Sequence, residues 1–522
     1  MKIVTTEEMR LLEERCGLEG ISQDTLMEKA GLAVAQKARE FLGDVRGVPI
    51  LTLVGPGNNG GDGLVATHHL SNWGADATVY VALPRKNADP NGQLLLDPGA
   101  AVCRAEDDIG FSWLTGQLAK VSLVIDAVLG TGRARPIEGT LAEILSMLVN
   151  ARASRPKLSL MALDLPTGLN ADTGESDPLC PAADVTVALG FPKVGLFGFP
   201  GASQVGRLDV VDIGIPVSLA EDVPQELITS DWVKNTLPRR PLDSHKGTFG
   251  RVLVVAGSMN YIGAAYLACE GAARVGAGLV TLAIPRSLQP LLATKLTEVT
   301  YLLLPEEEDA LSPEASDVIL SELPGYQALL AGCGLGQGSD VAQLLQQTLN
   351  TARYPGVPMV LDADALNIMS RQPEWWLGLK GEAVVTPHPG EMSRLTGRTT
   401  KDINSARLNT TRERAIQWSK SVVLKGAYTV VSSPQGQVRM SPFANPGLAS
   451  AGTGDVLAGA IAGLLAQGMS TFDAASCGVY LHGAAGEQAK YEMGDTGIVA
   501  SDILPRLPLA IKQVKEGKTH TN

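Results

Sequence analysis

Residues 48–63 carry the sequence VPILTLVGPGNNGGDG, in which a short apolar run passes directly into a glycine-rich segment. The run at 48–54 has the aliphatic and β-branched composition of a buried strand in a parallel sheet. From Gly55 to Gly60 the glycines have G-x-G-x-x-G spacing, and a helical pattern follows at 64–73. A strand, a glycine turn and a helix in this order form the first unit of a doubly wound α/β fold. The sequence therefore predicts a Rossmann-like domain here.

This glycine turn differs in two ways from that of a dinucleotide-dependent oxidoreductase. Such an enzyme carries an acidic residue at the end of its second strand to bind ribose, whereas the expected second strand at 78–83 leads to Pro84 and two basic residues. The turn also contains Asn58, Asn59 and Asp62. We therefore expect it to handle a reactive group or an ion as well as phosphate. A purely structural glycine turn is the alternative.

Two further strands of this series have an aspartate at the point where the strand leads into a turn. Asp126 and Asp164 each lie near the end of an apolar run. Because the carboxyl ends of parallel strands are where doubly wound folds bind ligands, we expect both carboxylates to converge with residues 58–62 on one crevice. Each aspartate taken alone is also a common turn former. The oxygens of Asn59, Asp126 and the Thr167 region are suited to an alkali cation.

The apolar runs form two series, separated by a stretch with little periodicity. The first series ends at 208–213 and the second starts at 251–256, while residues 216–242 between them contain several prolines. This alternation of strands and helices predicts the α/β class, with two doubly wound α/β domains. The expected parts are an N-terminal Rossmann-like domain at 1–216, a linker region at 217–240 and a C-terminal domain at 241–522.

Near the C-terminal end, residues 451–459 have the sequence AGTGDVLAG. The glycines allow backbone N–H groups to point at an anion, and the start of the following apolar helix adds a partial positive charge. Asp455 lies in the first turn of this helix, where it can accept a proton from an attacking hydroxyl. The segment therefore predicts phosphoryl transfer. The alternative is that Asp455 only caps the helix.

The composition is that of a globular protein without an extended charged partner. The 522 residues are 45% apolar, which suits two or three domains. The 55 acidic and 43 basic residues give a net charge of −12, which argues against nucleic acid or an anionic membrane as the main partner. The six cysteines form no C-x-x-C pair, so neither a disulfide framework nor a zinc site is expected. Without a signal-like N-terminus or a membrane-length apolar run, we expect a cytoplasmic protein.

Taken together, the motifs resemble those of the bifunctional NAD(P)H-hydrate (NAD(P)HX) repair enzymes, in which an epimerase domain is fused to an ADP- or ATP-dependent dehydratase domain. The resemblance covers nearly the whole chain, and its C-terminal half is similar to the ribokinase-like kinases. It rests on seven motifs in order, GPGNNGGDG (55–63), DAVLGTGRARP (126–136), DLPTGLNADTG (164–174), HKGTFGRVLVVAGS (245–258), DADALN (362–367), TPHPGE (386–391) and AGTGDVLAG (451–459).

For the N-terminal domain, the resemblance implies a damaged cofactor as substrate, namely NADH or NADPH whose nicotinamide ring has added water. The domain would interconvert the two stereoisomers of this hydrate, with Asp164 as the candidate for proton transfer. Asn59, Asp126 and Thr167 would surround a potassium ion, although serine is more usual in place of Thr167. The residues implied in hydrate binding are Asn58, Asn59, Gly60, Gly61, Asp62, Gly130, Thr131, Gly132, Arg133, Ala134, Arg135, Pro136 and Asp164.

For the C-terminal domain, the resemblance implies that Asp455 helps the ring hydroxyl attack the terminal phosphoryl group of ADP, after which phosphate is eliminated. Glu391 would orient magnesium through water. The hydrate pocket would be lined by Ala264, Gly336, His388 and Asp455. The nucleotide would be bound by Lys425, Gly426, Ala427, Tyr428, Thr429 and Gly454. A surface lysine and a loop histidine without a role are the alternatives for Lys425 and His388.

Two other functions stay open at this point. One is a kinase of a vitamin-like alcohol fused to a nucleotide-binding domain, and the other is a non-catalytic binding role for the N-terminal half. The expected partners are the small molecules NADHX, NADPHX and ADP. The sequence leaves open whether ADP or ATP is the donor, which of the two hydrates is preferred, whether the chain is a homo-oligomer, and how substrate passes between the two sites.

Overall fold

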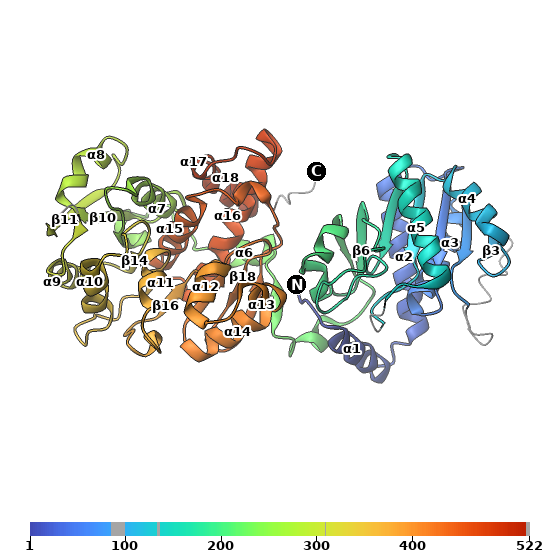
Figure 1. The fold of residues 1–522 in the computed structure, drawn as a ribbon, viewed down its shortest axis with the longest axis horizontal. Helices are drawn as coiled ribbons and strands as arrows, with labels where there is room; N and C mark the ends of the chain where they lie inside the picture. Colours follow the sequence, from blue (N-terminus) through green and yellow to red (C-terminus); the bar gives the residue numbers. More distant parts are fainter. Residues whose placement is uncertain (85–99, 133–135, 308–309, 518–522) are drawn as a thin grey trace. The chain divides into compact units, whose positions relative to one another are not determined.

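The computed structural model describes residues 1–84, 100–132, 136–307 and 310–517 (Figure 1). The chain divides into two compact units, Met1–Pro224 and Gln225–Asn522. Strand β8 (Gln225–Leu227) and helix α6 (Ser230–Thr236) lie within the stretch expected to be a linker. The domain boundaries that the sequence suggests, at 216 and 241, stay predictions.

The first unit is built on a parallel sheet of seven strands in the order β3-β2-β1-β4-β5-β6-β7. The strands are β1 (Pro49–Val54), β2 (Asp76–Val81), β3 (Ala101–Arg104), β4 (Leu123–Ala127), β5 (Ser159–Leu163), β6 (Val185–Leu189) and β7 (Arg207–Val211). The helices are α1 (Thr6–Leu18), α2 (Gln23–Leu42), α3 (Asn58–Asn72), α4 (Ser112–Leu118) and α5 (Gly139–Ser154). Separate apolar cores cover the two faces of the sheet. The strand order reverses between β1 and β4, which is where such sheets bind ligands.

The sequence predicted a glycine turn with a helix from residue 64 onward. In the structure most of the glycine-rich segment is already helical. Helix α3 begins at Asn58, with Gly57 as its N-cap. The glycines allow the backbone of α3 to approach β4 closely, because a Cβ atom on Gly63 would lie 2.5 Å from the Cβ atom of Ala127. The polar residues of the motif therefore project from the first turns of a helix at the point where the strand order reverses.

The second unit contains a ten-stranded sheet in the order β11-β10-β9-β14-β15-β16-β17-β18-β19-β8. Its strands from β11 to β17 pair in parallel, and β18 is antiparallel to both of its neighbours. Besides β8 they are β9 (Arg251–Val255), β10 (Leu279–Pro285), β11 (Thr300–Leu304), β14 (Ala328–Ala331), β15 (Met359–Leu361), β16 (Ala383–Val385), β17 (Ser421–Leu424), β18 (Val430–Ser432) and β19 (Val438–Met440). A small separate pair consists of β12 (Glu306–Glu307) and β13 (Ala310–Leu311). The predicted α/β class with two doubly wound domains is confirmed.

The helices of this unit pack on both faces of the sheet, over two apolar cores (Figure 1). Besides α6 they are α7 (Ile262–Arg274), α8 (Gln289–Ala293), α9 (Ala315–Glu322), α10 (Ser339–Leu349), α11 (Asp364–Met369), α12 (Pro389–Thr396), α13 (Thr400–Ser405), α14 (Arg407–Trp418), α15 (Thr453–Ala466), α16 (Thr471–Met493), α17 (Ala500–Ile503) and α18 (Arg506–Glu516). None of the helices within the described residues is long and apolar enough to cross a membrane.

Twelve of the 14 residues of α15 are buried, and this helix packs against α7 across glycines. A Cβ atom on Gly459 would lie 2.1 Å from the carbonyl oxygen of Ala268 in α7, and one on Gly271 of α7 would lie 2.5 Å from the carbonyl oxygen of Val456. At both positions only glycine allows the two backbones to come so close. The contact fixes the helix whose first turn carries Asp455.

Candidate active sites

Asp126 forms the centre of the first site, within β4 and fully buried. Its carboxylate accepts hydrogen bonds from the hydroxyl of Thr167 at 2.6 Å and from the backbone N–H of Thr167 at 2.8 Å. Burial raises the pKa of Asp126, although these hydrogen bonds act in the opposite direction. A cation bound nearby would therefore favour the charged form of this carboxylate.

Asn59 lies next to the same turn, in the first turn of α3. A Cβ atom on Gly130 would lie 3.1 Å from the Cβ atom of Asn59, and the N–H of Leu129 donates to the Thr167 hydroxyl at 3.1 Å. Asn59 Nδ2 is buried and has no hydrogen-bond partner within the described part of the chain. The oxygen atoms of a carboxylate, a hydroxyl and a side-chain amide are hard ligands of the kind that bind alkali and alkaline-earth cations. These residues therefore fit the potassium ion that the resemblance implies.

Asp164 follows β5 directly and is held by a buried ion pair. Its backbone is in the left-handed region, with φ of 66°, and its carboxylate lies 2.5 Å from Lys193 Nζ, a side chain that is 1% exposed. The N–H of Leu189 donates to the same carboxylate at 3.0 Å, and Lys193 also donates to the Leu189 carbonyl oxygen at 3.1 Å. A strained backbone together with a buried charge pair fixes one orientation of this carboxylate.

The other residues predicted for the first site differ in exposure. Gly60, Gly61 and Asp62 are buried in the first turns of α3, whereas Asn58 is exposed. Residues 130–132 and Pro136 are partly or fully exposed. Arg133, Ala134 and Arg135 lie outside the described residues.

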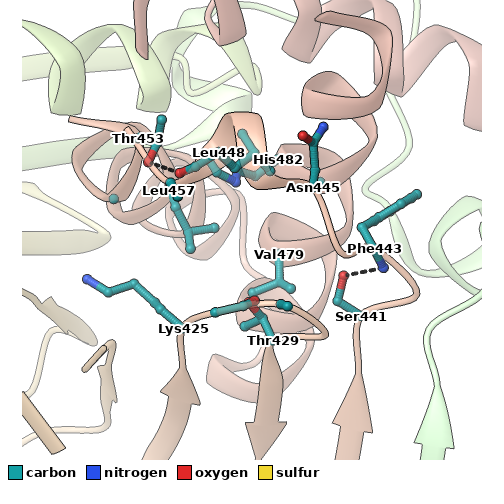
Figure 2. A pocket seen from close by; sticks show the side chains of 15 residues that line it. Lys425, Thr429, Ser441, Phe443, Asn445, Leu448, Thr453, Leu457, Val479 and His482 are labelled. Carbon is teal, nitrogen blue, oxygen red and sulfur yellow. Dashed lines mark hydrogen bonds between the residues drawn. The ribbon is translucent and has the colours of Figure 1, made fainter. Parts of the chain in front are cut away.

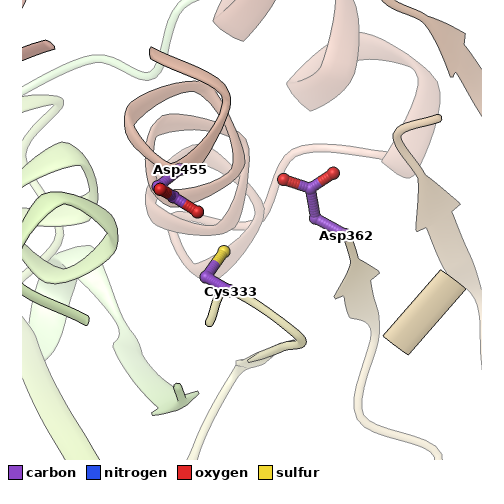
Figure 3. A group of neighbouring side chains, drawn as sticks. All are labelled: Cys333, Asp362 and Asp455. Carbon is purple, nitrogen blue, oxygen red and sulfur yellow. The ribbon is translucent and has the colours of Figure 1, made fainter. Parts of the chain in front are cut away.

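The second site is centred on Asp455, the third residue of α15. Gly452, the N-cap of this helix, has φ of 89°. A carboxylate oxygen of Asp455, one of Asp362 and the sulfur of Cys333 all lie within 4.8 Å of one another (Figure 3). Burial, followed by the negative charge of Asp362, raises the pKa of Asp455 to about 7. The carboxyl group can therefore take up or release a proton near neutral pH, as a general base requires.

Lys425 balances the negative charge of this cluster. Its ammonium group, at the end of β17, lies 2.6 Å from a carboxylate oxygen of Asp362 and 3.8 Å from one of Glu391. Burial alone would lower the pKa of Lys425, but these two carboxylates raise it overall, so the ammonium group stays charged. The Thr386 hydroxyl also donates to Asp362, at 2.7 Å.

His388 is the N-cap of α12, and Glu391 lies in the first turn of this helix. The backbone N–H of His388 donates to Glu391 at 2.8 Å, and the N–H of Gly390 donates to His388 Nδ1 at 3.0 Å. Burial raises the pKa of Glu391 to about 7 and lowers the pKa of His388. Because the His388 side chain is 50% exposed, its ring is open to a ligand that approaches the carboxylates.

The two other residues predicted for the hydrate pocket lie in neighbouring loops. The backbone N–H of Gly336 donates to Asp364 at 2.9 Å. A Cβ atom on Gly334, two residues earlier, would lie 2.8 Å from the Cβ atom of Ala264 at the start of α7. The loop that follows β14 therefore packs against the start of α7 and carries Cys333 into the acidic cluster.

A cavity adjoins this cluster, with a volume of about 670 Å³ including the open solvent at its mouth. Five of the six predicted nucleotide-binding residues line it, all except Tyr428 (Figure 2). The full set of lining residues is Lys425, Gly426, Ala427, Thr429, Ser441, Phe443, Asn445, Leu448, Ala449, Thr453, Gly454, Leu457, Val479, His482 and Gly483.

Several residues of the two sites were not singled out by the sequence. Lys193 stands alone among apolar residues after β6, and Asp362 ends the run that forms β15. The position of Asp362 at the carboxyl end of a parallel strand was a usable signal. Arg407 donates to the carbonyl oxygens of Leu424 and Lys425 at 3.0 and 3.2 Å. It thereby supports the segment that leads into the cavity, and no sequence motif marked it.

The fold and the two sites define a two-unit α/β enzyme with buried carboxylates at the carboxyl ends of both sheets. A family model described as NAD(P)H-hydrate dehydratase matches residues 252–508, and one described as YjeF-related protein N-terminus matches residues 23–195. The chain belongs to the family of bifunctional NAD(P)H-hydrate repair enzymes. The predicted family is therefore confirmed.

Relatives in distant organisms match along the full length. The bifunctional NAD(P)H-hydrate repair enzyme Nnr of Moorella thermoacetica is 41% identical over 99% of this chain and 98% of its own. That of Thermofilum pendens is 36% identical over 99% and 97%. Among solved structures, an ADP/ATP-dependent NAD(P)H-hydrate dehydratase from Bacillus subtilis, co-crystallised with ATP and Mg²⁺, is 33% identical, with a TM-score of 0.48. The match covers 56% of this chain and 100% of that one.

Proposed function

We propose that this protein restores hydrated NADH and NADPH to the intact cofactors in two steps. The first unit interconverts the R and S forms of the hydrate, and the second dehydrates the S form at the expense of ADP, which gives AMP and phosphate. The second step is supported by the Asp455 carboxyl group, which lies at the start of α15 beside the cavity. Burial raises its pKa to about 7.

In the second unit, the oxygen of the ring hydroxyl attacks the β-phosphorus of ADP, and Asp455 accepts the proton of this hydroxyl. The bond from that phosphorus to the bridging oxygen breaks, and AMP leaves with the electron pair. Backbone N–H groups at 452–454 and the Lys425 ammonium group stabilise charge on the transferred group. The carbon–oxygen bond then breaks, driven by the ring nitrogen lone pair. Phosphate leaves, and loss of a proton from the adjacent ring carbon restores the dihydropyridine.

The carboxylates around Lys425 also fit magnesium, which would be held by Glu391 through water and would neutralise charge on the phosphates. Glu391 is buried beside Asp362, and burial raises its pKa to about 7. The negative charge of Asp362 acts in the same direction and that of the Lys425 ammonium group acts against it, so a further cation would favour the charged form of Glu391.

In the first unit, Asp164 moves the proton that allows the hydrated carbon to change configuration, and its ion pair with Lys193 orients this carboxylate. Residues 58–62 and 130–136 bind the hydrate. Asn59, Asp126 and Thr167 would hold potassium, which would supply positive charge at this site.

The test uses the full chain with a mixture of both NADH-hydrate isomers, magnesium, potassium and either ADP or ATP. The near-ultraviolet absorbance of restored NADH reports the reaction. We expect complete conversion of both isomers, with free phosphate and AMP as products when ADP is supplied. A stable phosphorylated product would favour a kinase instead, and no restored NADH with either nucleotide would overturn the proposal. Conversion of one isomer only would remove the epimerase step.

The pH dependence of dehydration follows from Asp455. Its pKa is about 7, and the base must be ionised to accept the hydroxyl proton, so the rate rises with pH up to about 7 and then levels off. Below that value we expect a fall of about tenfold per pH unit. Initial rates between about pH 5.5 and 8.5 at saturating ADP measure this dependence. A rate that does not change across this range would contradict the assignment of Asp455.

Potassium should stabilise the first unit through Asp126. In the wild-type protein we expect potassium chloride to raise the melting temperature of this unit by about 2–4 °C over choline chloride at equal ionic strength, because a ligand bound to the folded state alone shifts unfolding. Asp126→Asn removes the charge that attracts the ion and should abolish the shift. Asp76→Asn, at an exposed position of β2, serves as the control and should keep it. A shift that survives Asp126→Asn would contradict the assignment.

A further inference from the structure

His482 is a buried polar side chain that neither catalysis nor the predicted site uses. It lies on α16, is 8% exposed and lines the cavity. Its Nε2 atom is buried and has no hydrogen-bond partner among the residues that the structure describes. An unsatisfied polar atom of this kind is costly in a folded protein unless a ligand completes it.

The cavity that His482 lines has a charged part, at Lys425, and an apolar part, at Phe443. At the charged end, a Cβ atom on Gly454 would lie 3.4 Å from Lys425 Nζ. At the apolar end, a Cβ atom on Gly483 would lie 2.3 Å from the ring of Phe443. Figure 2 shows His482 on the same wall as Leu448 and Thr453, across the cavity from Lys425 and Thr429. A nucleotide with its phosphates at Lys425 would place its sugar or base beside this ring.

The protonation state of the ring follows from its surroundings. Burial lowers the pKa of His482 to about 4, so the ring is neutral at physiological pH. It also makes a hydrogen bond to the backbone of Thr453 that favours a proton on the ring. Because Nε2 has no partner, we assign this bond and the single proton to Nδ1. Nε2 is then an acceptor, which suits a hydroxyl or amino group and not a phosphate oxygen.

We infer that His482 Nε2 accepts a hydrogen bond from a donor group of the bound nucleotide, either a ribose hydroxyl or the amino group of adenine. The inference rests on the proposed function, because it takes the cavity to be the nucleotide site. His482 thereby contributes to the recognition of the nucleotide and does not take part in phosphoryl transfer. A nucleotide that lacks the donor leaves a buried nitrogen unsatisfied and binds less tightly.

The test is calorimetric binding to the full chain with magnesium, using ADP, 2′-deoxy-ADP, 3′-deoxy-ADP and inosine diphosphate. The deoxy analogues report the ribose hydroxyls, and inosine diphosphate reports the amino group. We expect one of the three to bind about tenfold more weakly than ADP, as the loss of one buried hydrogen bond predicts. His482→Leu should weaken ADP binding by a similar factor and abolish the preference over that analogue. His482→Gln, which keeps an acceptor oxygen, should recover part of both.

Cys477→Ala is the matched control, because Cys477 is buried on the same helix and does not line the cavity. It should keep the preference. In steady-state assays His482→Leu should raise the KM for ADP and change kcat little, which loss of packing alone would not produce. A wild-type protein without any preference, or a preference that survives in His482→Leu, overturns the inference alone. A wild-type protein that binds no ADP overturns the proposed function and the inference with it.

Discussion

Asp455→Asn should reduce dehydration by about a thousandfold, because the substitution removes the proton acceptor and keeps the shape of the side chain. ADP binding should change by less than about threefold, since no hydrogen bond to the nucleotide is assigned to this carboxylate. Interconversion of the two hydrate isomers by the first unit should not change. Restored NADH measured at saturating ADP, together with calorimetric ADP binding, gives both quantities.

Asp402→Asn is the matched control for this experiment. Asp402 is also the third residue of its helix, α13, but its side chain is exposed. The control should keep full activity, which separates the proton acceptor from the general effect of an acidic residue at a helix start. If Asp455→Asn dehydrated the hydrate at a tenth of the wild-type rate or more, another group would have to be the base.

Lys193→Met should cost the first unit both its activity and much of its stability. The substitution leaves the Asp164 carboxylate buried without its counter-charge, and loss of one partner of such a pair costs about 3–5 kcal/mol. For a unit of this size we expect a melting temperature about 10 °C lower. Isomer interconversion should fall at least about a hundredfold, because the carboxylate loses both its charge balance and its orientation.

The double variant Asp164→Asn with Lys193→Met separates the two effects. It removes both charges, so it should regain most of the lost melting temperature and stay inactive. Lys37→Met is the control, since Lys37 pairs with Glu40 at the surface and an exposed pair contributes at most about 1 kcal/mol. A double variant that melts no higher than Lys193→Met would show that the pair is not what stabilises this region.

The strands of the central sheets could be predicted from the sequence because both of their faces are buried. Their side chains form short continuous apolar runs, as in β1, β9 and β14, and such runs stand out from the polar segments between them. Strands β8, β18 and β19 could not be predicted, because their sequences QEL, VVS and VRM each include a polar residue and form no continuous apolar run. Helix α3 was expected to begin later because glycines oppose helix formation in isolation. Its close contact with β4 outweighs that preference.

The candidate site could be predicted where a residue lies at the end of its strand, as Asp126 does, or directly after a strand or glycine turn, as Asp164 and Asp455 do. The partners of these residues could not be predicted, because they come from distant parts of the chain. Lys193 lies 29 positions from Asp164 and Lys425 lies 63 positions from Asp362. Only the folded sheet brings these charges together, and no local pattern records the pairing.

The glycine contact between α7 and α15 determines how the protein responds to random substitution. Gly459 is one helical turn below Asp455, and a Cβ atom there would overlap the backbone of α7. An alanine at Gly459 or Gly271 would push α15 aside and move Asp455 away from the attacking hydroxyl. A genetic screen for loss of the dehydratase would therefore recover changes at these glycines as readily as changes at Asp455. The glycines found in such a screen would not be ligand contacts, because substitutions there would disrupt the packing of α7 against α15.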